Sequence, residues 1–256
     1  MIPLLKICYN VCHTNMNVNC VPAGIVRHNQ RHRKEGFKMK GFIFDLDGTL
    51  LDSMPSWQHQ LDDMLMARGI TPPDDLLDRT KTLGLENATG MILQEFHLSD
   101  DPSLVYQQFQ DNMEQLYCTA IALKPGVRAF LDRLMADNIP MAVATATARP
   151  LVERALACQN LSQYFQSITT VAEVGIGKHN PRVFLAAADK LGLPAQQCIV
   201  VEDSLKAVRS ASQAGFQTIA IYEATNPAEQ QALQQEADRY IHDFRDFSSL
   251  HDDIFE

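Results

Sequence analysis

The sequence predicts an α/β protein, a doubly wound parallel sheet with an all-helical segment inserted after its first strand. Three observations support this fold class. Short apolar runs alternate with amphipathic helical segments beyond residue 124, a pattern typical of parallel strands covered by helices on both faces. An earlier apolar run, residues 41–44, is followed by a long stretch, 54–123, whose apolar residues recur at helical spacing. Polar residues stand directly after several of the apolar runs, at the edge where open parallel sheets bind their ligands.

The first predicted strand, residues 41–44, gives way to a turn of sequence Asp-Leu-Asp-Gly-Thr at 45–49. In the helical stretch that follows, Leu61 and Leu65 share one helix face, and Pro72-Pro73 interrupts the chain. The alternating pattern then predicts helices 127–138, 151–159, 181–191, 205–214 and 227–236 and strands 141–146, 167–171, 198–201, 217–221 and 240–241.

These elements divide the chain into three parts. Residues 39–53 and 124–256 form one core domain, and residues 54–123 form a helical domain inserted into it. Residues 1–38 are rich in Asn, Cys and His, then basic, without helical or strand periodicity or the apolar stretch of a secretory signal. Since Met39 directly precedes the first strand, we interpret residues 1–38 as a disordered leader or an extension upstream of the natural start. A transit peptide is the competing interpretation.

Charge and hydropathy narrow the possible partners. The formal net charge is −9, and residues 1–40 carry seven Lys and Arg against one acid, so the remaining 216 residues are strongly acidic. Nucleic-acid-binding proteins usually present a basic face, so no nucleic-acid partner is expected. No apolar run approaches the length of about 18 residues needed to span a bilayer, so no membrane span is expected. We expect a monomer.

The six cysteines fall into two groups. Cys8, Cys12 and Cys20 lie in the leader, where the C-x3-C spacing followed by His13 is only a weak indication of zinc binding. The other three lie in apolar surroundings, and we interpret them as buried thiols of a cytoplasmic protein in a reducing compartment: Cys118, Cys158 and Cys198.

Polar residues that make chemical sense together lie at the ends of four of the predicted strands or in the loops after them. The carboxyl ends of parallel strands meet at one edge of a sheet, so these side chains are expected to lie close together. Each alone has an ordinary explanation, such as a helix cap, a solvated lysine or a strand threonine. The candidate site residues are Asp45, Asp47, Thr145, Lys178, Glu202 and Asp203.

These residues carry a resemblance to a known family. The run 45–49 resembles the first motif of the haloacid dehalogenase (HAD) superfamily, and Thr145 is similar to the second. Lys178, followed by His-Asn-Pro, resembles the third motif, and the run 202–204 (Glu-Asp-Ser) resembles the fourth. The resemblance extends over about residues 39–240 and is to the subgroup of phosphatases and beta-phosphoglucomutases with a helical cap.

The resemblance implies a Mg²⁺-dependent phosphatase that hydrolyses a small phosphorylated metabolite, a sugar phosphate or a nucleoside monophosphate. Asp45 would attack phosphorus to give an aspartyl-phosphate. Asp47 would protonate the leaving alkoxide and then deprotonate the hydrolytic water. Thr145 and Lys178 would hold the phosphoryl oxygens.

The resemblance also implies a metal site made of oxygen ligands, which Mg²⁺ prefers. Its ligands would be the Asp45 side chain, the Asp47 backbone carbonyl, Asp203, and Glu202 directly or through water. The helical segment would be a cap that closes over the substrate on linkers near Ser53 and near residues 124–126 and excludes water.

Two alternative functions stay open. A sugar phosphomutase shares these motifs, but beta-phosphoglucomutases carry a histidine about where this chain has Trp57 and a basic residue where it has Leu83. His59 and Lys81 are possible substitutes. A catalytically silent binding module would be favoured by loss of the site residues, and all are present. We expect Asp52 and Ser53 to cap the first cap helix.

Overall fold

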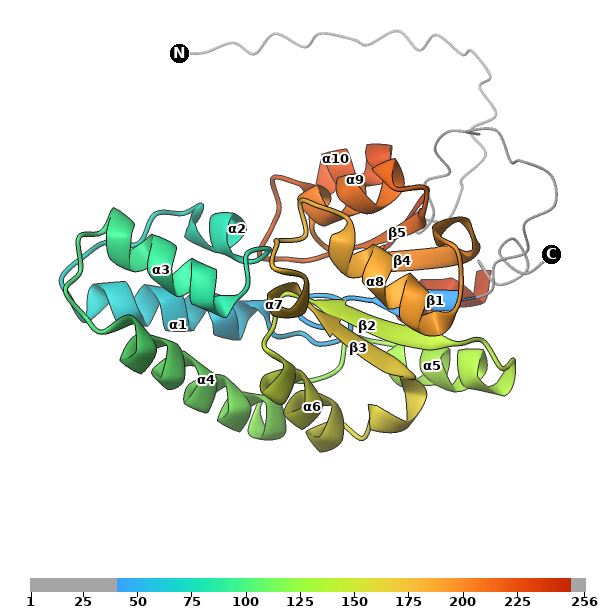
Figure 1. Ribbon diagram of the computed structural model, residues 1–256, viewed down its shortest axis with the longest axis horizontal. Coiled ribbons are helices and arrows are strands. Elements are labelled where there is room, and N and C mark those ends of the chain that lie inside the picture. The colour runs from blue at the N-terminus through green and yellow to red at the C-terminus, as the bar shows by residue number, and fades with distance from the viewer. Residues whose placement is uncertain (1–40, 250–256) are drawn as a thin grey trace, which may run out of the picture.

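A computed structural model of the protein describes residues 41–249 (Figure 1). The interpretation of residues 1–38, and that of the three leader cysteines, lies outside the described residues. No helix within residues 41–249 is long and apolar enough to cross a membrane.

The centre of the fold is a sheet of six parallel strands, which confirms the predicted fold class. The strand order is β3-β2-β1-β4-β5-β6, so the chain winds outward from β1 first to one side and then to the other. This order places a topological switch point between β1 and β4, where open α/β sheets bind ligands. The strands are β1 (Gly41–Phe44), β2 (Met141–Thr145), β3 (Ser167–Thr170), β4 (Cys198–Glu202), β5 (Gln217–Ile221) and β6 (Arg239–Ile241).

Helices cover both faces of the sheet. Side chains of a strand alternate between faces: Phe42 and Phe44 pack with α5 and α6, whereas Ile43 packs with α8 and α9. Helix α10 packs on α9 and β5. The helices of this part are α5 (Val127–Ala136), α6 (Arg149–Cys158), α7 (Val171–Val174), α8 (Arg182–Leu191), α9 (Leu205–Gln213) and α10 (Gln230–Glu236).

Two elements differ from the sequence prediction. The strand predicted to reach Val171 stops at Thr170, whose side chain accepts a hydrogen bond from the Glu173 backbone N–H and starts the short helix α7. Helix α10 begins at Gln230 and not at Pro227, since residues 227–229 form a turn; in this turn the Glu229 carboxylate accepts a hydrogen bond from the Leu205 N–H of the neighbouring helix. The other strand and helix bounds agree within about two residues.

The inserted segment is helical, as predicted. It lies to one side of the sheet in Figure 1 and has an apolar cluster of its own. The division into a core domain and a cap domain at residues 53/54 and 123/124 stays a prediction. The helices are α1 (Met54–Met66), α2 (Leu76–Thr80), α3 (Leu85–Glu95) and α4 (Pro102–Thr119).

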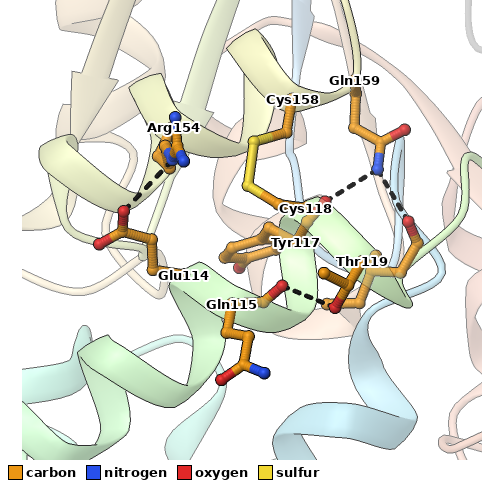
Figure 2. Close-up of a disulfide and its surroundings, with 9 residues drawn as sticks. Glu114, Gln115, Tyr117, Cys118, Thr119, Arg154, Cys158 and Gln159 are labelled. Atoms are coloured by element: carbon orange, nitrogen blue, oxygen red, sulfur yellow. Dashed lines mark hydrogen bonds and ion pairs between the residues drawn. A yellow bond between two sulfur atoms is a disulfide. The ribbon is translucent and has the colours of Figure 1, made fainter.

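The interpretation of three buried thiols is wrong for two of them. Cys118 at the end of α4 and Cys158 at the end of α6 form a disulfide (Figure 2). Cys118 is exposed and Cys158 half-buried. The two residues are 40 positions apart, and apolar neighbours in sequence carry no information on which helix ends meet in space. Cys198 is a buried free thiol, as predicted.

Candidate active site

All six predicted site residues line one pocket. It lies at the carboxyl ends of β1, β2 and β4, and the helical segment forms its opposite wall. Each of the six is buried. The neighbouring strands bring them together because Asp45 continues β1, donating its N–H to the Val201 carbonyl of β4 at 3.0 Å.

Asp45 and Lys178 form a buried ion pair. The Lys178 ammonium nitrogen lies 2.7 Å from Oδ1 of Asp45. Burial raises the pKa of Asp45 to about 7; Lys178 acts to lower it and Glu202 to raise it further. Burial lowers the pKa of Lys178, but the carboxylates of Asp45 and Glu202 outweigh burial and raise it above its usual value. Lys178 therefore stays a cation between two acids.

Glu202 holds this cation and the following turn. One carboxylate oxygen accepts a hydrogen bond from Lys178, and the other accepts the backbone N–H groups of Asp203 and Ser204, both at 3.0 Å. The Lys178 loop is further held by Ser210, whose hydroxyl donates to the Lys178 carbonyl at 2.5 Å. Both Glu202 oxygens thus have donors from the protein itself.

Asp203 completes an acidic group that can hold a cation. Carboxylate oxygens of Asp45, Glu202 and Asp203 lie within 4.8 Å of one another. Burial raises the pKa of Asp203 to about 7, with Lys81 lowering it and Asp45 raising it. Burial disfavours the ionised form of this carboxyl, and a cation bound beside it would offset that cost.

Gly48 is required where the first turn approaches Asp203. Its φ is +77°, and a Cβ at this position would lie 2.9 Å from the Asp203 carboxylate. Only glycine tolerates both conditions. Thr49, the next residue, donates its hydroxyl to Oδ1 of Asp203 at 3.2 Å.

Three hydroxyl groups hold the Asp47 carboxylate. Ser53 and Tyr117 donate to Oδ1, and Thr147 donates to Oδ2, each at 2.6 Å. The expectation that the Ser53 side chain caps α1 is wrong: Ser53 stands at the N-cap position, but its hydroxyl turns to Asp47 and makes no cap bond. Thr145 accepts the Thr147 backbone N–H at 3.1 Å, which positions this loop.

Sequence reasoning missed two residues of this site that come from distant segments. Tyr117 is on α4, 70 positions from Asp47, and is fully buried. Glu229 lies before α10, and its carboxylate is 3.6 Å from the Lys81 ammonium, which also pairs with Asp78 at 3.0 Å. No motif marks either position.

The helical segment supplies one cation and an apolar wall to the pocket. Lys81 lines it together with Trp57, whereas His59 is exposed and is not among the lining residues. The remaining lining residues of this wall are Met54, Leu61, Leu77, Thr80, Thr82, Gly84, Leu85 and Ala88.

A doubly wound parallel sheet with carboxylates and a buried lysine at its switch point defines an α/β enzyme whose site suits a cation and an anionic substrate together. Residues 39–215 match the family model of the haloacid dehalogenase-like hydrolases. The chain belongs to this family, which confirms the resemblance seen in the sequence.

The similar proteins include phosphatases. Hexitol phosphatase A of Escherichia coli is 30% identical over 72% of this chain and 83% of its own length. A phosphorylated carbohydrates phosphatase of Thermotoga maritima is 24% identical over 71% and 84%. Among solved structures, CbbY of Rhodobacter sphaeroides in complex with phosphate has a TM-score of 0.70 at 24% identity and covers 82% of this chain and 96% of its own. The prediction of a HAD-like phosphatase is confirmed at this level.

Proposed function

We propose that this protein is a Mg²⁺-dependent phosphatase of a small phosphorylated metabolite, acting through an aspartyl-phosphate on Asp45. The observation that carries the proposal is the pairing of Asp45 with an oriented second carboxylate, Asp47, in one pocket. Asp45 would attack phosphorus in line with the leaving oxygen. Asp47, fixed by three hydroxyl donors, would protonate the leaving alkoxide and later accept a proton from water.

The donor set fits a hard divalent cation, because it consists of carboxylate and carbonyl oxygens. We assign the metal to the carboxylates of Asp45 and Asp203 and to the Asp47 carbonyl. Bound Mg²⁺ would neutralise charge on the phosphoryl oxygens. Glu202 is better suited to orienting Lys178 than to direct ligation, since both of its oxygens already accept hydrogen bonds. Lys178 and Thr145 would hold the phosphoryl group.

Residues 54–123 would act as the cap. The cap side of the pocket already contacts the core. The backbone N–H of Lys178 donates to the Thr82 carbonyl at 3.2 Å, and the Lys81 ammonium faces the Glu229 carboxylate. A pocket closed in this way excludes water from the reacting bond and suits a compact leaving group. The relatives named hexitol phosphatase and phosphorylated carbohydrates phosphatase support a sugar phosphate ahead of a nucleoside monophosphate.

The phosphomutase alternative is less well supported. Such an enzyme must hold a sugar hydroxyl for return of the phosphoryl group. Where beta-phosphoglucomutases carry a histidine, the first cap helix of this chain presents Trp57 to the pocket. His59, the possible substitute, is exposed. Lys81 does line the pocket, but Asp78 and Glu229 pair with it. The mutase is therefore kept as an outcome of the test.

The test incubates the full chain with MgCl₂ and a panel of hexitol, hexose, pentose and nucleoside monophosphates and measures inorganic phosphate. The proposal expects Mg²⁺-dependent release from at least one sugar or polyol phosphate. Interconversion of sugar phosphates without phosphate release would replace it with the mutase. Silence in both assays, with the protein folded, would favour a binding module.

We further propose that the protein is a cytoplasmic monomer, in which the exposed disulfide would be open to reduction.

Magnesium binding is expected to weaken as the pH falls through 7. The pKa values of Asp45 and Asp203 are both raised to about 7, chiefly by burial, and both groups must be ionised to bind the cation. Between pH 8 and pH 6 each carboxyl goes from about nine-tenths to about one-tenth ionised, so the Kd for Mg²⁺ should rise about tenfold for each group that titrates. Isothermal titration calorimetry at the two pH values measures this change.

The same pKa values predict the pH dependence of stability. A carboxyl with a raised pKa is protonated preferentially in the folded state. The metal-free protein therefore loses stability as the pH rises from 3.8, the ordinary pKa of an aspartate carboxyl, to about 7, the pKa of these two groups in the folded protein. Mg²⁺ should therefore raise Tm more at pH 8 than at pH 6. An equal Kd and an equal shift in Tm at both values would contradict the metal assignment.

A further inference from the structure

The end of cap helix α4 is bonded to core helix α6 at several points. Figure 2 shows the disulfide between Cys118 and Cys158 and, beside it, Gln159 reaching across to α4. The Gln159 amide donates to the Tyr117 carbonyl at 3.0 Å and to the Ile121 carbonyl at 2.7 Å. One turn earlier, Arg154 and Glu114 form an ion pair at 3.2 Å. The last turn of α4 is therefore fixed to the core and not only to the cap.

Tyr117 and Cys118 are consecutive residues with opposite environments. A step of one residue turns the side chain by about 100° around a helix. Tyr117 is fully buried and donates its hydroxyl to Asp47 at 2.6 Å, whereas Cys118 is exposed at the surface next to α6. Any displacement of this turn moves both residues together.

We propose that Tyr117 is a positioning residue for Asp47 and that the Cys118–Cys158 disulfide holds it in place during cap movement. The inference rests on the proposed function, in which Asp47 is the acid and base. Ser53 and Tyr117 share Oδ1 of Asp47, so Tyr117 fixes the rotation of the carboxylate that presents Oδ2 to Thr147 and the pocket. Of these three donors, Tyr117 alone belongs to a cap helix.

The position of the disulfide in the chain determines how the cap can move. Cys118 precedes the linker at residues 124–126. While the disulfide is closed, the last turn of α4 moves with the core, and opening of the cap must bend the chain on the N-terminal side of Cys118. Tyr117 then stays on Asp47 whether the cap is open or closed. With the disulfide reduced, apolar packing, hydrogen bonds and a surface ion pair still hold this turn, but no covalent bond stops it from moving with the cap.

Release needs a thiol reductant, and a dithiol supplies both steps of the exchange. The reductant's thiolate attacks one sulfur of the disulfide, and the resulting mixed disulfide is resolved by its second thiol. The Cys118–Cys158 bond breaks, both cysteines become thiols, and the reductant is oxidised to its own disulfide. Cys118 is exposed, so the bond is open to this attack, whereas Cys198 is buried in β4 and has no partner among the described cysteines.

The first arm of the test is Tyr117→Phe, with Tyr106→Phe on the same helix as the matched control. Loss of one donor to a catalytic carboxylate is expected to lower kcat about tenfold with KM changed less than about twofold. The loss should be smaller with p-nitrophenyl phosphate, whose leaving group hardly needs a proton, than with an alkyl phosphate substrate. Equal losses with both substrates, or none, would overturn the positioning role. Tyr106→Phe should match the parent.

The second arm compares oxidised and dithiothreitol-reduced protein for the parent, Tyr117→Phe and Cys118→Ser/Cys158→Ser. If the disulfide acts through Tyr117, reduction lowers kcat of the parent several-fold, leaves Tyr117→Phe nearly unchanged, and leaves the double cysteine variant at the level of the reduced parent. Such non-additivity is the signature of one shared interaction. Additive losses, or no effect of reduction on the parent, would overturn the coupling. If the double variant does not fold, the parent with and without reductant makes the same comparison.

A readout without turnover separates this inference from the proposed function. Trp57 is the chain's single tryptophan, and it packs against the buried cluster that contains Tyr117. Reduction should change Trp57 fluorescence in the parent and not in Tyr117→Phe. This result with no phosphate release from any substrate would reject the phosphatase and retain the coupling, whereas unchanged fluorescence with intact phosphatase activity would reject the coupling alone.

Discussion

Phosphate release is expected to disappear when Asp45 is replaced with asparagine. The amide nitrogen and oxygen fill the space of the carboxylate, but neither is a nucleophile that could form the proposed aspartyl-phosphate. Loss of a nucleophile in a catalytic unit lowers kcat by a factor on the order of 10⁴ or more. The fold should tolerate the change, because burial already raises the pKa of Asp45 to about 7, so a neutral side chain at this position removes a crowded negative charge.

The measurement is inorganic phosphate release from the best substrate of the panel, together with thermal unfolding of parent and variant. Asp52→Asn is the matched control: Asp52 is exposed in the linker before α1, and its variant should retain parental kcat. An Asp45→Asn enzyme that keeps more than about a hundredth of parental kcat, freshly prepared and free of deamidated material, would exclude Asp45 as the nucleophile.

The core of the fold is predictable from sequence because each buried strand is a short apolar run with a distinct end. Phe42 and Ile43 face opposite sides of the sheet and both are buried, so β1 has no polar alternation and can only be a central strand. The site residues follow from the same pattern. Asp45, Thr145 and Glu202 stand at strand ends, and parallel pairing of β1 with β2 and β4 brings those ends together.

What could not be predicted depends on contacts between segments far apart in the chain. Tyr117 occupies an ordinary apolar position of an amphipathic helix, and only the packing of α4 on α6 turns its hydroxyl to Asp47. The disulfide has the same origin, because helical spacing describes one helix and not which two helix ends meet. Ser53 is a local example. The sequence around it is the same whether its hydroxyl caps the helix or donates to Asp47, so the sequence could not predict which bond it makes.

The second large effect is expected for stability when Lys178 is replaced with methionine. Lys178 is buried between Asp45 and Glu202. Removal of one partner from a buried ionic group leaves charge uncompensated and costs about 3–5 kcal/mol. The pKa of Glu202 is already raised by burial, as is that of Asp45, and loss of the cation that lowers both values raises them further. Both carboxyls then take up protons in the folded state, so the loss of stability should be greatest at pH 8 and smaller at pH 6.

Urea unfolding in the presence of EDTA, followed by circular dichroism at pH 6 and pH 8, measures this difference. Lys190→Met is the matched control, because Lys190 pairs with Glu173 at the surface with 39% of its side chain exposed, and such pairs contribute about 1 kcal/mol or less. A Lys178→Met protein as stable as the control at pH 8 would mean that the two acids are already protonated in the folded protein. In that case Lys178 would donate hydrogen bonds to two uncharged carboxyl groups. Its proposed role in holding the phosphoryl group would then have to rest on hydrogen bonding alone.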